Sequence, residues 1–227
     1  MARRSVVITG GFGVLGEAVS RAFAARGDQV ARIDRSDRAG GALQGVLDIG
    51  SIDLTDFDQA RSAVARVVAV HGTLDVLINV AGAFTWETLG DGEDTATWRR
   101  LFEANALTCA NMTKAALPEL LRAEEARVVS IGAIAALAAG AGMGAYAASK
   151  MAVHKLTESL AAELKEASVT VNAVLPSIID TEANRIAMPD ADRSDWVDPR
   201  TIAEAIVLLA SPEARGITGA LIPVTRR

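Results

Sequence analysis

Cysteine and histidine are almost missing from this sequence, which narrows the metal and redox chemistry that it can support. The single cysteine, Cys109, excludes an internal disulfide and a cysteine-based metal cluster. It falls in an apolar helical pattern, so we expect a buried structural thiol. The two histidines, His71 and His154, lie far apart at positions expected on helix surfaces. The sequence therefore predicts no metal site.

The sequence also lacks an excess of basic charge and any long apolar run. It has 23 lysines and arginines against 28 aspartates and glutamates, whereas nucleic-acid binding needs a basic surface. No stretch reaches the roughly 18 apolar residues of a membrane span, and the apolar part of the start, MARRSVVITG, is too short for a signal peptide. We expect a cytoplasmic protein that acts on a small molecule and binds neither nucleic acid nor membranes.

The chain does contain a regular alternation of short β-rich runs with longer helical patterns. Among the runs are SVVIT, QVARID, LDVLIN, ARVVSIG and VTVNAVL, and such alternation indicates βαβ units with a parallel sheet. We predict one α/β domain over residues 1–227, a Rossmann-type doubly wound parallel sheet of seven strands with helices on both faces. Residues 177–199 form the least regular stretch, and we expect a short substrate lid near 182–198.

A glycine-rich turn follows the first predicted strand and precedes a helical pattern. Gly11, Gly13 and Gly16 fit the pattern G-x-G-x-x-G in this context. Missing side chains there let the backbone approach a pyrophosphate at the positive end of a helix. The turn therefore predicts a dinucleotide site made of Gly10, Gly11, Phe12, Gly13, Val14, Leu15 and Gly16.

Asp34 ends the next predicted strand, at the distance from the glycine turn that dinucleotide-binding units use. A carboxylate there accepts hydrogen bonds from ribose hydroxyls and repels a 2′-phosphate, which favours NAD(H) as the cofactor. The neighbouring Arg35 can pair with a phosphate. NADP(H) therefore stays open as the alternative.

Tyr146 is the only tyrosine of the chain and precedes Lys150 by four residues in a helical pattern. This spacing places both side chains on one helix face. A tyrosine hydroxyl, with an ordinary pKa of about 10, can donate a proton at neutral pH, and it needs a nearby positive charge to act as a base. The pair predicts a proton donor with a cationic partner.

Taken in order, these motifs resemble the short-chain dehydrogenase/reductase family over essentially the whole chain. Val14 stands where the commoner form of the glycine turn has another glycine. The matching segments are TGGFGVLG (9–16), Asp53-Leu54, NVAG (79–82), Asn105 in FEANAL, YAASK (146–150) and VNAVLPSIIDT (171–181).

The resemblance implies a role for each matching residue. Tyr146 would be the general acid in reduction, Lys150 would bind the nicotinamide ribose, and Asn105 would hold a water that links the lysine to solvent. Asp53 and Leu54 would flank the adenine ring. The cofactor site implied by the resemblance also includes Asn79, Ala81, Gly82, Pro176, Ile178, Ile179 and Thr181.

The serine that this family usually places 13 residues before the tyrosine is missing, and Ala133 stands there. The nearest upstream hydroxyl is Ser130, three residues away along a strand, so its side chain is expected on the opposite face. Ser149, on the helix of the tyrosine, is interpreted as structural or cofactor-facing. An ordinary ketone reductase built this way should be impaired.

Several segments resemble the dihydropteridine reductase-like branch of the family, which also has an alanine before its Tyr-x-x-x-Lys and prefers NADH. They include GGFGVLG, IGAIAAL and VLPSIIDTEANRIAMPDADRSDW. The resemblance implies a conjugated acceptor such as a dihydropterin. An ordinary aldehyde or ketone reductase, of 3-oxoacyl or alcohol type, and a non-catalytic dinucleotide-binding protein are the alternatives. The residues expected near the substrate are Ala133, Phe84, Trp86, Met143 and Trp196.

Family members usually pair through two long helices, which this sequence predicts at about 95–123 and 144–166. Their apolar character permits such an interface. By this analogy alone we expect a homodimer or homotetramer.

Overall fold

The computed structural model describes residues 3–37, 41 and 43–226 and has the predicted single-domain α/β architecture. Seven parallel strands form one sheet in the order β3-β2-β1-β4-β5-β6-β7. The central strands β1, β4, β5 and β6 are buried at every residue, as expected for a parallel sheet covered on both faces. The strands are β1 (Ser5–Thr9), β2 (Gln29–Ile33), β3 (Leu47–Ile49), β4 (Val76–Asn79), β5 (Ala126–Ile131), β6 (Val169–Pro176) and β7 (Leu221–Val224).

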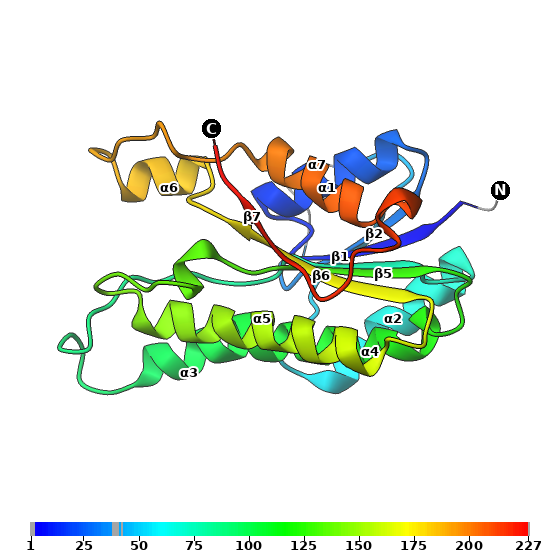
Figure 1. Cartoon of the computed structure of the whole chain (residues 1–227), viewed down its shortest axis with the longest axis horizontal. Coiled ribbons are helices and arrows are strands. Elements are labelled where there is room, and N and C mark those ends of the chain that lie inside the picture. The colour runs from blue at the N-terminus through cyan, green and yellow to red at the C-terminus, as the bar shows by residue number, and fades with distance from the viewer. Residues whose placement is uncertain (1–2, 38–40, 42, 227) are drawn as a thin grey trace.

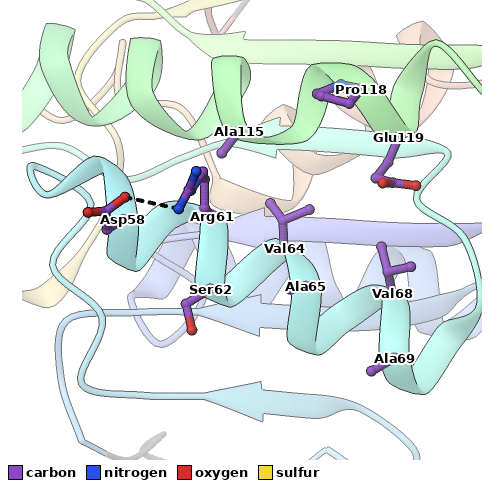
Figure 2. Close-up of a pocket in the computed structure, with 10 residues that line it drawn as sticks. All are labelled: Asp58, Arg61, Ser62, Val64, Ala65, Val68, Ala69, Ala115, Pro118 and Glu119. Carbon is purple, nitrogen blue, oxygen red and sulfur yellow. Dashed lines mark ion pairs between the residues drawn. The ribbon is translucent and has the colours of Figure 1, made fainter.

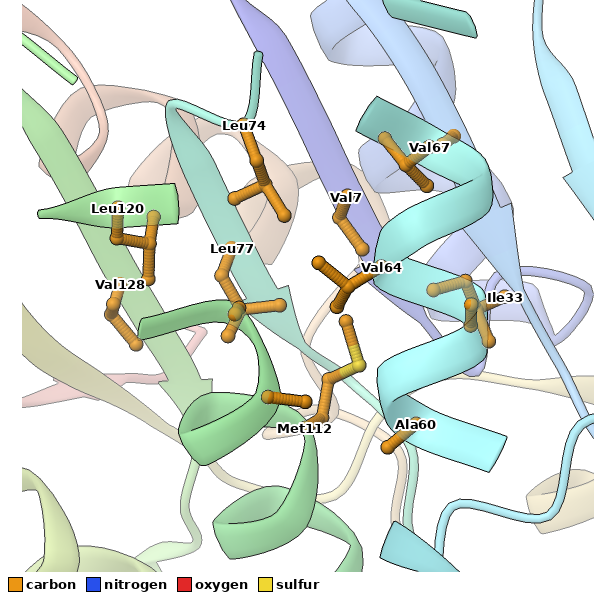
Figure 3. Packing of buried hydrophobic residues seen from close by; sticks show 14 of the residues in the cluster. Val7, Ile33, Ala60, Val64, Val67, Leu74, Leu77, Met112, Leu120 and Val128 are labelled. Carbon is orange, nitrogen blue, oxygen red and sulfur yellow. The ribbon is translucent and has the colours of Figure 1, made fainter. Parts of the chain in front are cut away.

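Helices cover the two faces of this sheet, so the doubly wound prediction is confirmed (Figure 1). Helices α1 and α7 pack on one face, and α2, α4 and α5 pack on the other. Figure 3 shows the second of these cores, where Val64 of α2 and Met112 of α4 lie close to Leu77 of β4. The helices are α1 (Val14–Ala25), α2 (Phe57–His71), α3 (Ala96–Phe102), α4 (Thr108–Leu120), α5 (Gly144–Glu163), α6 (Glu182–Ala187) and α7 (Pro199–Leu209).

The order of the strands reverses between β1 and β4, which places a topological switch point at the carboxyl ends of these two strands. From β1 the chain winds outward to β2 and β3, and then in the opposite direction from β4 to β7. Ligands of doubly wound sheets bind where the direction reverses. The two strand ends are tied together here, because Thr9 Oγ1 accepts hydrogen bonds from the N–H groups of Val80 (3.0 Å) and Ala81 (3.1 Å).

The prediction of one continuous helix over 95–123 is wrong in the middle of that range. The structure has α3, then a π-helical turn over Glu103–Leu107, then α4. A π turn carries an extra residue in its hydrogen-bonded ring and often marks a functional position. Apolar spacing does not reveal such a turn, because both flanking helices keep the ordinary period. The other long helix, predicted to end near 166, ends at Glu163.

The segment over 182–198, expected to be a lid, contains one short helix and is anchored at both ends. Helix α6 begins after Thr181, whose hydroxyl accepts a hydrogen bond from Asn184 N–H (3.2 Å). The far end returns to pair with the chain after β6, since Val197 N–H donates to Ile178 O and Asp180 N–H donates to Val197 O, both at 2.8 Å. Its role as a lid stays a prediction.

A hollow of about 720 Å³ lies between α2 and α4 (Figure 2). An ion pair of 3.3 Å joins Asp58 and Arg61 at one side of it, and Val64 and Val68 supply apolar surface. None of the predicted site residues lines this hollow, so it is separate from the carboxyl ends of β1 and β4. Among the described residues no helix is both long and apolar enough to cross a membrane.

Candidate active site

The glycine turn between β1 and α1 fits a dinucleotide. Gly10 has φ of +61°, and a Cβ added there would lie 2.9 Å from Ala81 N. A Cβ on Gly16 would lie only 2.1 Å from Gly10 O. Helix α1 begins after Gly13, and no side chain in the described structure caps it. The first N–H groups of α1 are therefore free to bind a pyrophosphate, which is the chemistry that NAD(P) requires.

Asp34 lies beside this turn, directly after β2, as predicted. Its Oδ2 accepts a hydrogen bond from Phe12 N–H and its Oδ1 accepts one from Ser36 N–H, both at 3.0 Å. The carboxylate is thereby fixed against the glycine turn. Each oxygen keeps lone-pair capacity for a further donor, such as a ribose hydroxyl.

Arg32 is a buried cation beneath the turn that the sequence reasoning missed. Its guanidinium donates two hydrogen bonds to Asp48 (2.7 and 2.8 Å) and lies 5.3 Å from the centre of the Phe12 ring. Gly11 packs on it, because an added Cβ would lie 2.5 Å from Arg32 Cβ. Arg32 therefore supports the turn, and its positive charge is already balanced by the carboxylate of Asp48.

Arg35 and Asp53 lie together at the outer edge of the predicted adenosine site. Asp53 accepts hydrogen bonds from the Thr55 hydroxyl (2.7 Å) and N–H (2.9 Å). These bonds, helped by the charge of Arg35, hold the pKa of Asp53 below its usual value. Arg35 itself is exposed, and the neighbouring Leu54 is buried.

Asn105 sits in the π turn and joins three segments. Its Oδ1 accepts from Ala83 N–H (2.8 Å), while its Nδ2 donates to Ala83 O (3.0 Å) and to Ser149 Oγ (2.9 Å). A Cβ on Gly82 would lie 2.5 Å from Asn105 Oδ1 and 3.3 Å from Lys150 Nζ. Asn105 and Lys150 therefore meet over the backbone of Gly82.

Tyr146 and Lys150 share one face of α5, as the spacing predicts. Lys150 is buried and its Nζ donates to Ile131 O at 2.8 Å. Burial lowers the pKa of Lys150 to about 8 and raises the pKa of Tyr146 to about 12. At pH 7 the tyrosine therefore holds its proton and the lysine is mostly charged, which is the state needed to donate a proton to a substrate.

Ala133 follows β5 and is buried, and the serines near it serve other contacts. Ser130 accepts a hydrogen bond from Asn79 Nδ2 (3.3 Å) and lies 3.6 Å from Cys109 Sγ, so its hydroxyl faces α4. Ser149 Oγ donates to Tyr146 O (2.7 Å) within α5 and accepts from Asn105 Nδ2, contacts that favour a structural role. Asn79 is itself buried among these groups.

The apolar residues predicted near the substrate fall into two groups. Phe84 is half exposed and meets the Tyr146 ring edge-on, with centroids 5.0 Å apart. Trp86 Nε1 donates to Ala141 O (3.0 Å), which fastens the loop after β4 to the loop that carries Met143 into α5. Trp196, in contrast, is 3% exposed and packs near Arg193.

The remaining predicted cofactor residues lie at the end of β6. Pro176 is the last residue of that strand and is buried, and Ile178 is exposed. Ile179 pairs with Val197, and Thr181 caps α6. These residues flank the carboxyl edge of the sheet on the side where the 182–198 segment begins.

His154 is the residue nearest Ala133 that the sequence reasoning misplaced. It was expected on a helix surface but is completely buried. Its Nε2 accepts a hydrogen bond from Ala133 N–H at 3.2 Å. The spacing of four residues after Lys150 placed it on the site-facing side of α5, and this signal could have found it.

Known dehydrogenases and reductases match this chain along most of its length. A family model described as short chain dehydrogenase matches residues 4–191. The 3-oxoacyl-(acyl-carrier-protein) reductase FabG of Vibrio harveyi is 29% identical, over 96% of this chain and 94% of its own. The oxidoreductase UcpA of Salmonella typhimurium is 31% identical, over 95% and 90%.

A solved structure agrees with these relatives. A short-chain type dehydrogenase/reductase from Mycobacterium ulcerans superposes with a TM-score of 0.90 at 28% identity, covering 97% of this chain and 88% of its own. Membership of the dihydropteridine reductase-like branch stays a prediction. With the glycine turn and the Tyr146–Lys150 pair in place, the chain belongs to the short chain dehydrogenase family and is an NAD(P)-dependent oxidoreductase.

Proposed function

We propose that this protein reduces a small conjugated or carbonyl acceptor with NADH, and that Tyr146 donates the proton. The observation that carries the proposal is the cluster of Tyr146, Lys150 and Asn105 beside the glycine turn, at the carboxyl edge of the sheet. The nicotinamide, when bound, supplies the hydride. The side chains of the protein place the acceptor and deliver the proton.

Each member of the cluster has a distinct task in this proposal. Tyr146 holds the transferred proton on its hydroxyl, because burial keeps that group protonated at neutral pH. Lys150 supplies positive charge near the tyrosine and donors for the nicotinamide ribose. Asn105 is a positioning residue, since both of its N–H groups are already used to hold Ala83 and Ser149.

The environment of Asp34 supports NADH over NADPH. The carboxylate lies against the glycine turn, and the cation beneath it, Arg32, is paired with Asp48. A 2′-phosphate placed here would meet the charge of Asp34, and within residues 32–37 the cation free to offset that charge is Arg35.

Substituting Asp34 by asparagine should raise the ratio of kcat/KM for NADPH to that for NADH by about tenfold, a change worth about 1.4 kcal/mol. The amide keeps an oxygen for Phe12 N–H but removes the repulsive charge. Steady-state kinetics with both cofactors measures the ratio, and Asp37→Asn on the same loop is the matched control. An unchanged ratio would show that Asp34 does not set the cofactor preference.

The missing hydroxyl at position 133 supports a conjugated acceptor such as a quinonoid dihydropterin. A simple ketone develops charge on one oxygen during reduction, and losing one donor to that oxygen typically costs about 10²- to 10³-fold in rate. A conjugated ring spreads this charge over several atoms. It therefore depends less on a second donor beside Tyr146.

A carbonyl reductase is the second candidate, and the relatives favour it. FabG of Vibrio harveyi is named for the reduction of a 3-oxoacyl group. If this chain acts on such a carbonyl, a donor other than a side chain at position 133 must serve the oxygen.

Restoring the hydroxyl separates the two candidates. We expect wild-type protein to oxidise NADH with a quinonoid dihydropterin generated in the cuvette, and Ala133→Ser to change this rate less than threefold. The same variant should gain about tenfold or more on a 3-oxoacyl thioester or simple ketone. Rapid ketone turnover by the wild type without a gain in the variant would instead establish the carbonyl reductase.

A further inference from the structure

His154 lies one helical turn beyond Lys150 and two beyond Tyr146, so the three side chains stack along one face of α5. The imidazole is fully buried beneath the end of β5. Burial, together with the charge of Lys150, lowers the pKa of His154. The ring is therefore neutral at pH 7 and can accept a hydrogen bond.

The imidazole contacts the two residues that follow β5. Ala133 N–H donates to Nε2 at 3.2 Å. The preceding residue, Gly132, leaves room for the ring, because an added Cβ would lie 2.4 Å from Nε2 and 2.7 Å from Cδ2. Gly132 and His154 therefore form a matched pair, because the imidazole occupies the space that a side chain at position 132 would fill.

Three consecutive backbone groups at this point have defined partners. Ile131 O accepts from Lys150 Nζ, and Gly132 N–H donates to Val174 O, each at 2.8 Å. The third group, Ala133 N–H, donates to His154 Nε2. Two side chains of α5 thus fix the end of β5 relative to the helix that carries Tyr146.

This arrangement does not serve stability alone. His154 Nδ1 is buried, and none of the described residues pairs with it. An unpaired buried donor lowers the stability of a fold. A leucine would remove this donor but would leave Ala133 N–H without its acceptor. A buried polar group kept at such a position calls for an explanation in function.

We infer that His154 is a positioning residue of the reaction: its Nε2 holds the Ala133 backbone, and with it one wall of the acceptor site, at a fixed place relative to the Tyr146 hydroxyl. The inference rests on the proposed function, in which Ala133 borders the acceptor. Displacing a reacting group by about 1 Å can cost about 10²-fold in rate. Position 133 thus lacks a side-chain hydroxyl, but its backbone N–H is held in place by the imidazole.

The first test compares two substitutions of the imidazole. His154→Leu removes the acceptor, whereas His154→Gln supplies an amide oxygen in its place. We expect His154→Leu to lower kcat about tenfold or more, with the Kd for NADH within twofold. The melting temperature should change little, because removing the unpaired Nδ1–H offsets the acceptor that Ala133 N–H loses. His154→Gln should recover a large part of kcat. The matched control is His71→Leu, which removes the other histidine and should leave kcat unchanged.

The second test uses the fit between Gly132 and the ring. Gly132→Ala should lower kcat in the wild type, because its Cβ displaces the imidazole. In a His154→Ala background the methyl group clashes with no ring, and only the flexible end of Leu175, 3.1 Å away, must shift slightly. Gly132→Ala should therefore lower kcat much less there than in the wild type. Independent effects of the two substitutions on kcat would contradict the pairing.

The outcomes separate this inference from the proposed function. If Tyr146→Phe is inactive while His154→Leu keeps wild-type kcat, the positioning role is wrong and the reductase proposal stands. If kcat falls in His154→Leu only in step with a lower melting temperature, and glutamine does not restore it, His154 is structural. If Tyr146→Phe is fully active, the proposed function fails whatever the histidine variants do.

Discussion

Replacing Tyr146 by phenylalanine is expected to lower kcat by about 10³- to 10⁴-fold, the upper range for loss of a general acid. The substitution removes one oxygen, so the ring keeps its edge-on contact with Phe84. The Kd for NADH should stay within twofold, because the glycine turn, Asp34 and Lys150 are untouched. The loss of NADH absorbance with time measures kcat, and a fluorescence titration with NADH measures the Kd.

Because Tyr146 is the only tyrosine in the chain, its ionisation can be followed directly. Burial raises the pKa of Tyr146 to about 12, so the tyrosinate absorbance of the free protein should emerge only in strongly alkaline solution. The phenylalanine variant supplies the blank. A variant that still turned over at the wild-type rate would exclude Tyr146 as the proton donor. Tight NADH binding with no turnover of any acceptor, in variant and wild type alike, would favour a non-catalytic dinucleotide-binding protein.

The fold was predictable because its signals are local and repeated. Continuous apolar runs such as SVVIT and ARVVSI predict strands buried on both faces, and the helical patterns between them require parallel connections. The glycine turn and Asp34 follow successive strands, so their positions side by side could be predicted, and the structure shows them in hydrogen-bond contact. Their part in cofactor binding stays a prediction. Tyr146 and Lys150 follow from helix geometry alone.

The features that escaped prediction depend on contacts between distant segments. The π turn at Asn105 pairs an amide with the backbone of Ala83, 22 residues earlier, and nothing in the local sequence specifies that contact. His154 is polar in a helix with a weak apolar stripe, so its burial under Gly132 is decided by the end of β5. Both cases concern polar groups whose partners are backbone atoms, which side-chain patterns do not encode.

Replacing Lys150 by methionine should lower kcat about 10²-fold and raise the Kd for NADH about tenfold, because a buried charge and its donors disappear from beside Tyr146 and the ribose site. Methionine has a similar length and fits an apolar environment, so the helix packing is retained. Ile131 O loses its partner at the same time. NADH titration and steady-state kinetics separate the loss of binding from the loss of rate.

The pH dependence assigns this effect to the charge of Lys150. Burial lowers the pKa of Lys150 to about 8, whereas that of Tyr146 is raised to about 12. The kcat/KM for NADH reports ionisations of the free enzyme, so in the wild type it should fall about tenfold per pH unit above pH 8, as Lys150 loses its proton. Lys150→Met should lack this alkaline limb, and Lys150→Arg, which stays charged, should lack it while binding NADH more tightly than the methionine variant. An alkaline limb near pH 8 that persisted in Lys150→Met would have to come from another group, and the lysine would then act through its hydrogen bond to Ile131 O and not through its charge.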